Sequence, residues 1–308
     1  MCASAMGRKM KRWLLVVSCV VFGAFLGTAG EASPKLSVTE AGGGAQNVLT
    51  YSASAGSTQK SEVIWNISIA MDMGGMAFPM DVPEMKMGFL SSVQDASQSG
   101  VLRSQLELTS VKMAEADTES SHPMAGQMVA DMQKLVGVKF VNEWERSGRS
   151  LSSDVKDAGK ANADMVKELS GALGESLVVF PTQPVGVGAK WTVTEDRSER
   201  GVQVRKVTSY ELLERTGTQV KVRISISGEP LSKTVNSPEL PPGTTGQLTE
   251  FKMTGGGTAT YDLARILPLE SSIKVQVATK MNVTGEGQTM ALASTVVLGL
   301  GIRSESGP

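Results

Sequence analysis

The sequence predicts an α+β protein of mainly antiparallel β structure, with a large curved or half-barrel-like sheet and two short amphipathic helices packed against it. Three observations lead to this fold class. Apolar and polar side chains alternate along several extended runs, glycines separate these runs, and only two segments have helical periodicity. Alternation with a period of two buries one face of a strand, and consecutive strands joined by short turns pair in antiparallel fashion.

The clearest alternation covers residues 63–73, where Trp65, Met71 and Met73 fall on one face. The same alternation recurs at lower strength in residues 102–108, 220–226, 273–283 and 296–302. Glycines are favoured in the turns between such strands. We therefore expect turns at Gly56, Gly100, Gly201, Gly217, Gly228, Gly285 and Gly287.

Two segments, residues 123–136 and 162–173, are predicted to be short helices because their apolar side chains recur at helical spacing. Gly174 is expected to cap the second helix. Two isolated helices cannot link parallel strands throughout the chain, so both are expected to cover the sheet. The apolar stripe of the first helix consists of Met124, Met128, Met132 and Leu135.

A segment rich in proline and glycine, residues 180–191, divides the chain. This division suggests two β-rich halves, although one continuous domain fits the sequence nearly as well. The predicted organisation is a signal peptide (1–29), a flexible lead-in with a short strand at 35–39 (30–45), an N-terminal half with two helices (46–179), a C-terminal half (180–303) and a tail (304–308).

The N-terminal segment has the features of a secretory signal peptide. Basic residues at 8–12 precede an apolar run over residues 13–26, and small residues follow it. The run is shorter than the roughly 20 residues that a membrane-spanning helix needs. We therefore expect cleavage near Ala29, no transmembrane anchor afterwards, and an extracytoplasmic protein, periplasmic or secreted.

Both cysteines, Cys2 and Cys19, lie in the predicted signal peptide, so the mature chain would contain no disulfide. Residues 16–19 resemble a bacterial lipobox, but the apolar run continues past Cys19. Lipidation at Cys19 is therefore not expected. The whole chain has Lys+Arg 30 and Asp+Glu 31, and the only charged side chains that cleavage removes are basic. The mature chain therefore has an acidic excess, which does not favour binding to nucleic acid.

A family resemblance becomes visible around the proline and glycine segment. Its motifs are Phe-Pro and Pro-Val followed by Gly-x-Gly-x-x-Trp up to Trp191, then Tyr210, the three glycines at 255–257, and Tyr-Asp-Leu at 261–263 before Leu-Pro at 267–268. These motifs resemble an uncharacterised family of secreted bacterial proteins, domain of unknown function 6263. The resemblance covers most of residues 46–302, and it implies no catalytic or ligand-binding residue.

Catalytic chemistry has few candidates in this sequence. His122 is the single histidine, and it precedes Pro123 at the start of a predicted helix, where a solvated role is commoner than a catalytic one. The acidic pair Asp81 and Glu84 could serve a glycosidase, but acidic residues in a loop bounded by prolines are more often solvated. The glycines at 255–257 lack the following Lys-Ser/Thr of a phosphate-binding loop. We therefore predict no catalytic residue, no metal site, no cofactor and no enzyme.

Methionine is concentrated in residues 71–87 and in the first predicted helix. Methionine fills irregular gaps and lines adaptable apolar pockets, so packing or pocket lining is the favoured interpretation. Thioethers also bind Cu(I), and the alternative is a copper site in a glycine- and proline-rich turn, formed by Met76, Met80 and Met85. The predicted ligand-binding residues are Trp65, Met71, Met73, Met124, Met128 and Met132.

These observations predict an exported, non-enzymatic protein that binds a lipid or another small hydrophobic molecule in an apolar cavity lined by methionine. The alternative is a structural or interaction protein of the cell envelope whose partner is an envelope protein. A methionine-rich Cu(I)-binding protein is the less favoured third hypothesis.

Overall fold

The computed structural model describes residues 34–96, 100–114, 130–159, 163–174, 177–199, 201–235, 240, 243–285 and 287–305. The described residues form a 13-stranded sheet, a two-stranded sheet and helix α3 (Ala163–Gly174). The strands are β1 (Lys35–Glu40), β2 (Gly43–Asn47), β3 (Thr58–Met73), β4 (Met76–Ala96), β5 (Val101–Met113), β6 (Lys139–Glu145), β7 (Ser150–Lys156), β8 (Val185–Val187), β9 (Lys190–Glu199), β10 (Val202–Thr216), β11 (Gln219–Pro230), β12 (Thr234–Val235), β13 (Thr245–Asp262), β14 (Glu270–Gly285) and β15 (Gln288–Ser304).

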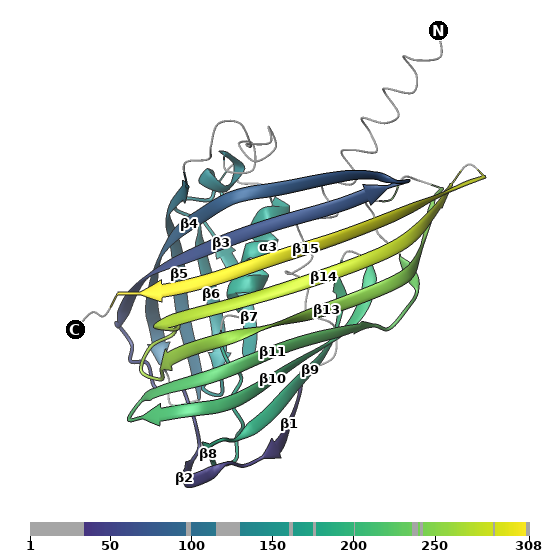
Figure 1. Cartoon of the computed structure of the whole chain (residues 1–308). Coiled ribbons are helices and arrows are strands. Elements are labelled where there is room, and N and C mark those ends of the chain that lie inside the picture. The colour runs from purple at the N-terminus through teal and green to yellow at the C-terminus, as the bar shows by residue number, and fades with distance from the viewer. Residues whose placement is uncertain are drawn as a thin grey trace.

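The large sheet is antiparallel and follows the order β1-β9-β10-β11-β13-β14-β15-β3-β4-β5-β6-β7, with β12 paired to β13. It curls so that β5, β6 and β7 turn behind the long strands, and α3 packs on the inner side against β6 and β7 (Figure 1). Among the described strands β1 and β7 do not pair, so the sheet is open. The prediction of a mainly antiparallel, curved sheet with a few helices is confirmed.

The last strand joins the two halves that the sequence suggested. β15 pairs with β3 along its length, from Leu292 opposite Met73 to Ser304 opposite Ser61. The strands on either side of the proline and glycine segment therefore belong to one continuous sheet. The segment 30–45, expected to be a flexible lead-in with a short strand, contains all of β1 and the first residues of β2.

Two local predictions need correction. Gly228 lies inside β11 instead of forming a turn, opposite Met253 of β13. The segment 76–85 is part of the continuous strand β4, not a glycine- and proline-rich turn. The turn is confined to Gly74 and Gly75, whose φ values are 61° and 89°, and Gly75 N donates to Asp72 Oδ1 at 2.9 Å.

The prolines of β4 are tolerated because they lie where the strand is a sheet edge. β5 pairs with β4 only from Met85 to Ala96, so among the described strands residues 76–84 have a single neighbour, β3. Proline lacks an N–H group and is found in sheets at edges of this kind. Pro79 and Pro83 therefore remove two N–H donors from this stretch of β4.

The helix predictions are partly testable. α3 matches the predicted helix at 162–173, with Val166, Leu169 and Leu173 buried. Of the other predicted helix, residues 130–133 are helical and a turn follows them. His122, Met124 and Met128 lie outside the described residues.

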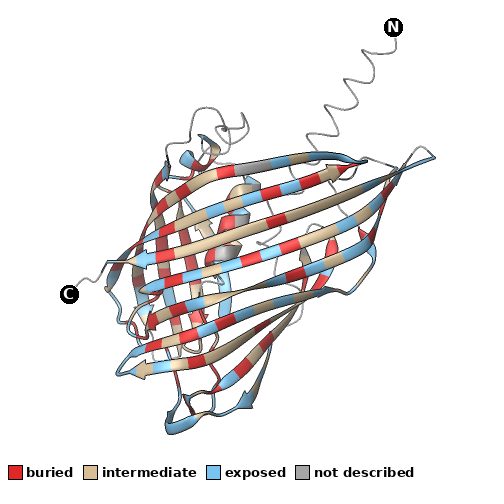
Figure 2. Cartoon of the chain, viewed as in Figure 1, coloured by how far each residue is buried: buried red, intermediate tan, exposed pale blue. Residues whose placement is uncertain are grey.

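Buried and exposed residues alternate along the long strands, as the bands of Figure 2 show, because successive side chains lie on an inner and an outer face. In an antiparallel sheet, directly opposed residues place their side chains on the same face. Trp65 is opposite Leu300, which in turn is opposite Ile273, so these three share the inner face. Exposed polar residues such as Lys274 and Gln276 occupy the outer face.

A non-sheet connection holds the two ends of the open sheet together. Tyr51 N donates to Arg146 O at 2.8 Å and Arg146 Nη1 donates to Tyr51 O at 3.1 Å, next to the β6–β7 turn. On its other side, the Tyr51 hydroxyl accepts from Val178 N at 3.2 Å. The fully buried Tyr51 ring packs on Phe180, and Phe180 contacts Trp191 of β9.

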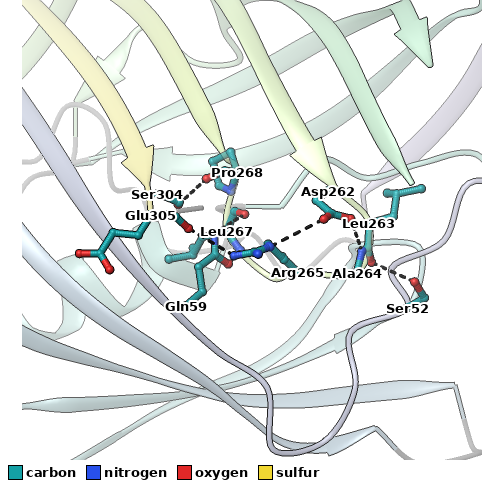
Figure 3. A network of polar contacts seen from close by, with 10 residues as sticks. All are labelled: Ser52, Gln59, Asp262, Leu263, Ala264, Arg265, Leu267, Pro268, Ser304 and Glu305. Carbon is teal, nitrogen blue, oxygen red and sulfur yellow. Dashed lines mark hydrogen bonds and ion pairs between the residues drawn. The ribbon is translucent and has the colours of Figure 1, made fainter. Parts of the chain in front are cut away.

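The β13–β14 connection closes the same end of the molecule, and Figure 3 shows its contacts. Gln59 donates to Leu267 O at 3.0 Å and accepts from Leu267 N at 3.2 Å. Ser304 Oγ donates to Pro268 O at 2.7 Å, and Ser52 N donates to Leu263 O at 2.6 Å. The Tyr-Asp-Leu and Leu-Pro motifs of the sequence thus lie in a connection that is hydrogen-bonded to β3, to β15 and to the segment before β3.

The three glycines at 255–257 lie in the middle of β13, where only a missing side chain permits the close approach of neighbouring strands. A Cβ on Gly257 would overlap Ser272 O and lie 2.8 Å from Ile273 Cα, and one on Gly256 would lie 2.7 Å from Ile224 O. Glycine within a strand commonly marks a tight bend. These residues allow the sheet to curl between β11 and β14.

We predict that Gly257→Ala lowers the free energy of unfolding by about 1–3 kcal/mol, because the methyl group overlaps the neighbouring backbone. Gly301→Ala in β15 is the control, since its Cβ would have no neighbour closer than 3.6 Å. The control should leave stability unchanged or raise it by up to about 1 kcal/mol. Urea denaturation measures both. Equal stability of the two variants would refute this account of the bend.

The buried tyrosines predict a loss of stability at alkaline pH. Burial raises the pKa of the Tyr51 hydroxyl well above its usual value, and burial likewise raises the pKa of Tyr210 and of Tyr261. Above about pH 10 the unfolded chain releases these protons and the folded chain retains them. Stability contributed by these groups is therefore present below about pH 10 and is lost as pH rises, by up to about 1.4 kcal/mol per pH unit for each tyrosine.

Tyr51→Phe separates this effect from the general alkaline response. The variant should be less stable at neutral pH by about 1–3 kcal/mol, because Val178 loses a buried hydrogen-bond partner. It should nevertheless lose less stability than the parent as pH rises from about 9 to about 11. Urea denaturation across this range tests it, and equal slopes for the two proteins would contradict the assignment.

Candidate functional site

The inner face of the central strands is the candidate site. Its centre is formed by apolar side chains that pair in register across β3, β15 and β14. We call this set the apolar face, and it consists of Trp65, Ile67, Leu298, Leu300, Ile273 and Val275.

The apolar face is less completely buried than the rest of the core. Trp65, Leu300 and Ile273 are partly buried and pack against the main core, and Ile67 and Leu298 are also partly exposed. α3 packs mainly against β6 and β7. The central strands therefore present accessible apolar surface on the inner side of the curl.

Buried clusters border the apolar face along the strands. Towards the β3–β4 turn, Ile69, Met71, Met73 and Val296 form one buried cluster. Met253 and Val277 form another, on β13 and β14, together with Val275, the one buried member of the apolar face. Among the described residues, charged groups reach the inner face only farther across the sheet, on β9 and β10. There Arg197 Nε lies 3.2 Å from Glu195 Oε2, and Lys206 and Arg215 occupy inner positions of β10.

Two polar atoms in this region are buried without a hydrogen-bond partner among the described residues: Trp65 Nε1 and Ser271 Oγ. Ser271 is only 6% exposed and lies beside the apolar face, opposite Ile302. Burying a donor without a partner costs about 1–3 kcal/mol. A binding surface that is mostly apolar, with a small number of such polar groups, is typical of small-molecule sites.

The predicted ligand-binding residues occupy different parts of the inner side. Trp65 belongs to the apolar face, whereas Met71 and Met73 lie farther along β3 in the buried cluster near the turn. Trp65 and Met73 are eight residues apart on one strand, a separation of about 27 Å. Met132 is 2% exposed and belongs to the main core. Met124 and Met128 lie outside the described residues.

The alternative copper set does not converge. Met76 is 56% exposed next to the β3–β4 turn, whereas Met85 is 1% exposed within the main core. Nine positions of one strand separate them, about 25–30 Å. The side chain of Met80 lies outside the described part of the structure. A single metal ion cannot bind both Met76 and Met85.

The acidic candidates have structural roles where the structure describes them. Of the acidic pair, Glu84 lies 3.6 Å from Lys86. The side chain of Asp81 is outside the described part. Within the described ranges, no group of three or more His, Cys, Asp or Glu side chains is arranged to hold a metal ion.

No protein-family model matches the chain, and no curated protein matches it. Solved structures give weak likenesses. Pseudomonas aeruginosa OpdO is 7% identical at a TM-score of 0.19, over 80% of this chain and 97% of that one. Acinetobacter baumannii OccAB2 is 4% identical at a TM-score of 0.20, over 79% and 97%. The outer membrane protein opdK of P. aeruginosa is 7% identical at 0.19, over 81% and 99%. Likeness at this level carries no argument about fold or function.

In the described part of the chain, no helix has both the length and the apolar character required to span a bilayer.

We predict that replacing Met76, Met80 and Met85 by leucine together leaves Cu(I) affinity unchanged, because the sulfurs of Met76 and Met85 lie too far apart to share a site. The exchange conserves volume, so the free energy of unfolding should fall by less than about 1.5 kcal/mol for a buried position such as Met85. Competition with a Cu(I) chelator and urea denaturation measure the two effects. Tight Cu(I) binding by the parent that the triple variant lacks would show the geometric argument to be wrong.

Proposed function

We propose that the protein is exported and binds a lipid or another small hydrophobic molecule on the apolar face of its curved sheet. The observation that carries the proposal is the accessible apolar surface at the centre of the inner side, formed by Trp65, Ile67 and Leu298 with their neighbours in register. The N-terminal sequence supports export, since it has the charge and apolar pattern of a signal peptide.

The asymmetry of the sheet supports the choice of face. Outer positions of β14 bear exposed polar side chains, including Lys274, Gln276 and Lys280, whereas the paired inner positions are aliphatic. Each apolar side chain that a ligand covers contributes about 25 cal/mol per Å² of surface removed from water. A hydrocarbon ligand therefore gains free energy on the inner side and little on the outer side.

The proposal predicts lipid bound to the purified protein after refolding with envelope lipid, detected by native mass spectrometry and lipid extraction. Ile67→Asn should reduce the bound fraction about tenfold, because a covered amide without a partner costs over 1 kcal/mol. Ala70→Asn is the matched control, since residue 70 is an exposed position on the outer face of the same strand. Absence of lipid from the parent, or an equal loss in both variants, would reject the proposal.

The alternative function is a structural or interaction protein of the cell envelope. The open sheet supports this alternative, because β7 is an edge strand with mostly exposed residues. It has no second neighbour among the described strands. Edge strands can accept a strand from a partner. Pull-down from envelope extracts distinguishes the two functions, because the alternative predicts an envelope protein partner and no bound lipid.

A further inference from the structure

We propose that Trp65 Nε1 and Ser271 Oγ bind the carbonyl oxygen of a neutral acyl group, so that the ligand is an ester- or amide-containing amphiphile and not a plain hydrocarbon or a free fatty acid. This inference rests on the proposed function, because it names the ligand class of the same face. Both atoms are buried and have no partner among the described residues.

The strand register places the two groups near each other on the inner side. Trp65 pairs with Leu300, and the next inner residue along β15, Ile302, pairs with Ser271 of β14. The two Cα atoms are therefore two strands and one inner position apart, about 12 Å. An indole side chain extends several ångströms from its Cα, so one carbonyl group with its ester linkage can contact both residues, directly or through one water.

The chemistry of the two groups selects an acceptor. The indole N–H can only donate, and the serine hydroxyl can donate as well as accept. A carbonyl oxygen has two lone pairs and can accept from both. An ether analogue of the ester is the natural comparison, since it has the same chain length and lacks the carbonyl group.

The surroundings select a neutral group. The inner neighbours of the two residues in register are Val63, Leu300, Ile302 and Ile273, all apolar. A carboxylate buried there would need a cation. Among the described residues, the cations that register places on the inner face are Arg197 of β9 and Lys206 and Arg215 of β10. All three lie at least three strands away from Ser271. The acyl chain of a neutral ester can instead extend along the apolar face past Ile67 and Leu298.

The test compares 1-monodecanoylglycerol with 1-O-decylglycerol, which differ by one carbonyl group, in calorimetric titrations of the purified, delipidated protein. We expect the ester to bind about tenfold more tightly, the ratio for one hydrogen bond to a buried donor. Trp65→Phe, which keeps an aromatic ring but has no N–H, should reduce this preference to within about twofold. Ser271→Ala should reduce it in part, and Ser272→Ala, on the outer face of the same strand, should leave it unchanged.

The outcomes separate this inference from the proposed function. If neither compound binds the parent, the proposed function fails. Equal binding of the two compounds by the parent keeps the proposed function and overturns the carbonyl assignment. Persistence of the preference in both Trp65→Phe and Ser271→Ala also overturns it. Near-ultraviolet circular dichroism checks folding, and Ser271→Ala, a change of one hydroxyl, carries the test if Trp65→Phe does not fold.

Discussion

The structure depends on the way Tyr51 joins the two ends of an open sheet. Among the described strands β1 and β7 do not pair, so no hydrogen-bonded strand ladder closes the curl of the sheet. The Tyr51 segment replaces this missing pairing with hydrogen bonds to Arg146 on one side and Val178 on the other. Its ring then begins an aromatic series through Phe180 to Trp191. Rigid closure at this end allows the central strands to carry surface that is less buried.

This arrangement divides the inner side into parts with different tasks. The fully buried end, with Phe140, Trp144 and α3, supplies the burial on which stability depends. The central strands contribute aliphatic side chains that are only partly covered, and their two unpaired polar atoms are a cost that folding alone does not explain. Unsatisfied groups of this kind are commonly found where a protein interacts with something else.

The sequence specifies local structure well and long-range pairing poorly. The strand ending at Met73, the turn at Gly74 and Gly75, and α3 were predictable because their periodicity and turn chemistry are local. The strand over residues 76–84 was not predictable. Proline is acceptable at position 79 only because β5 does not pair with this part of β4, and the sequence does not show where that pairing ends. The role of the glycines at 255–257 likewise depends on the backbones of β11 and β14.

The candidate site was predicted in part for the same reason. Trp65 follows from alternation within one strand, but its neighbours Leu300 and Ile273 follow only from the pairing of β3 with β15 and β15 with β14. Methionine enrichment drew attention to Met71 and Met73, which the structure buries. That pairing also has a kinetic consequence: Ser61 meets Ser304 across 243 positions of sequence, so the sheet cannot be completed until the end of the chain is present. Contacts of such long range form slowly, so the pairing of β3 with β15 is expected to limit the rate at which the sheet is completed.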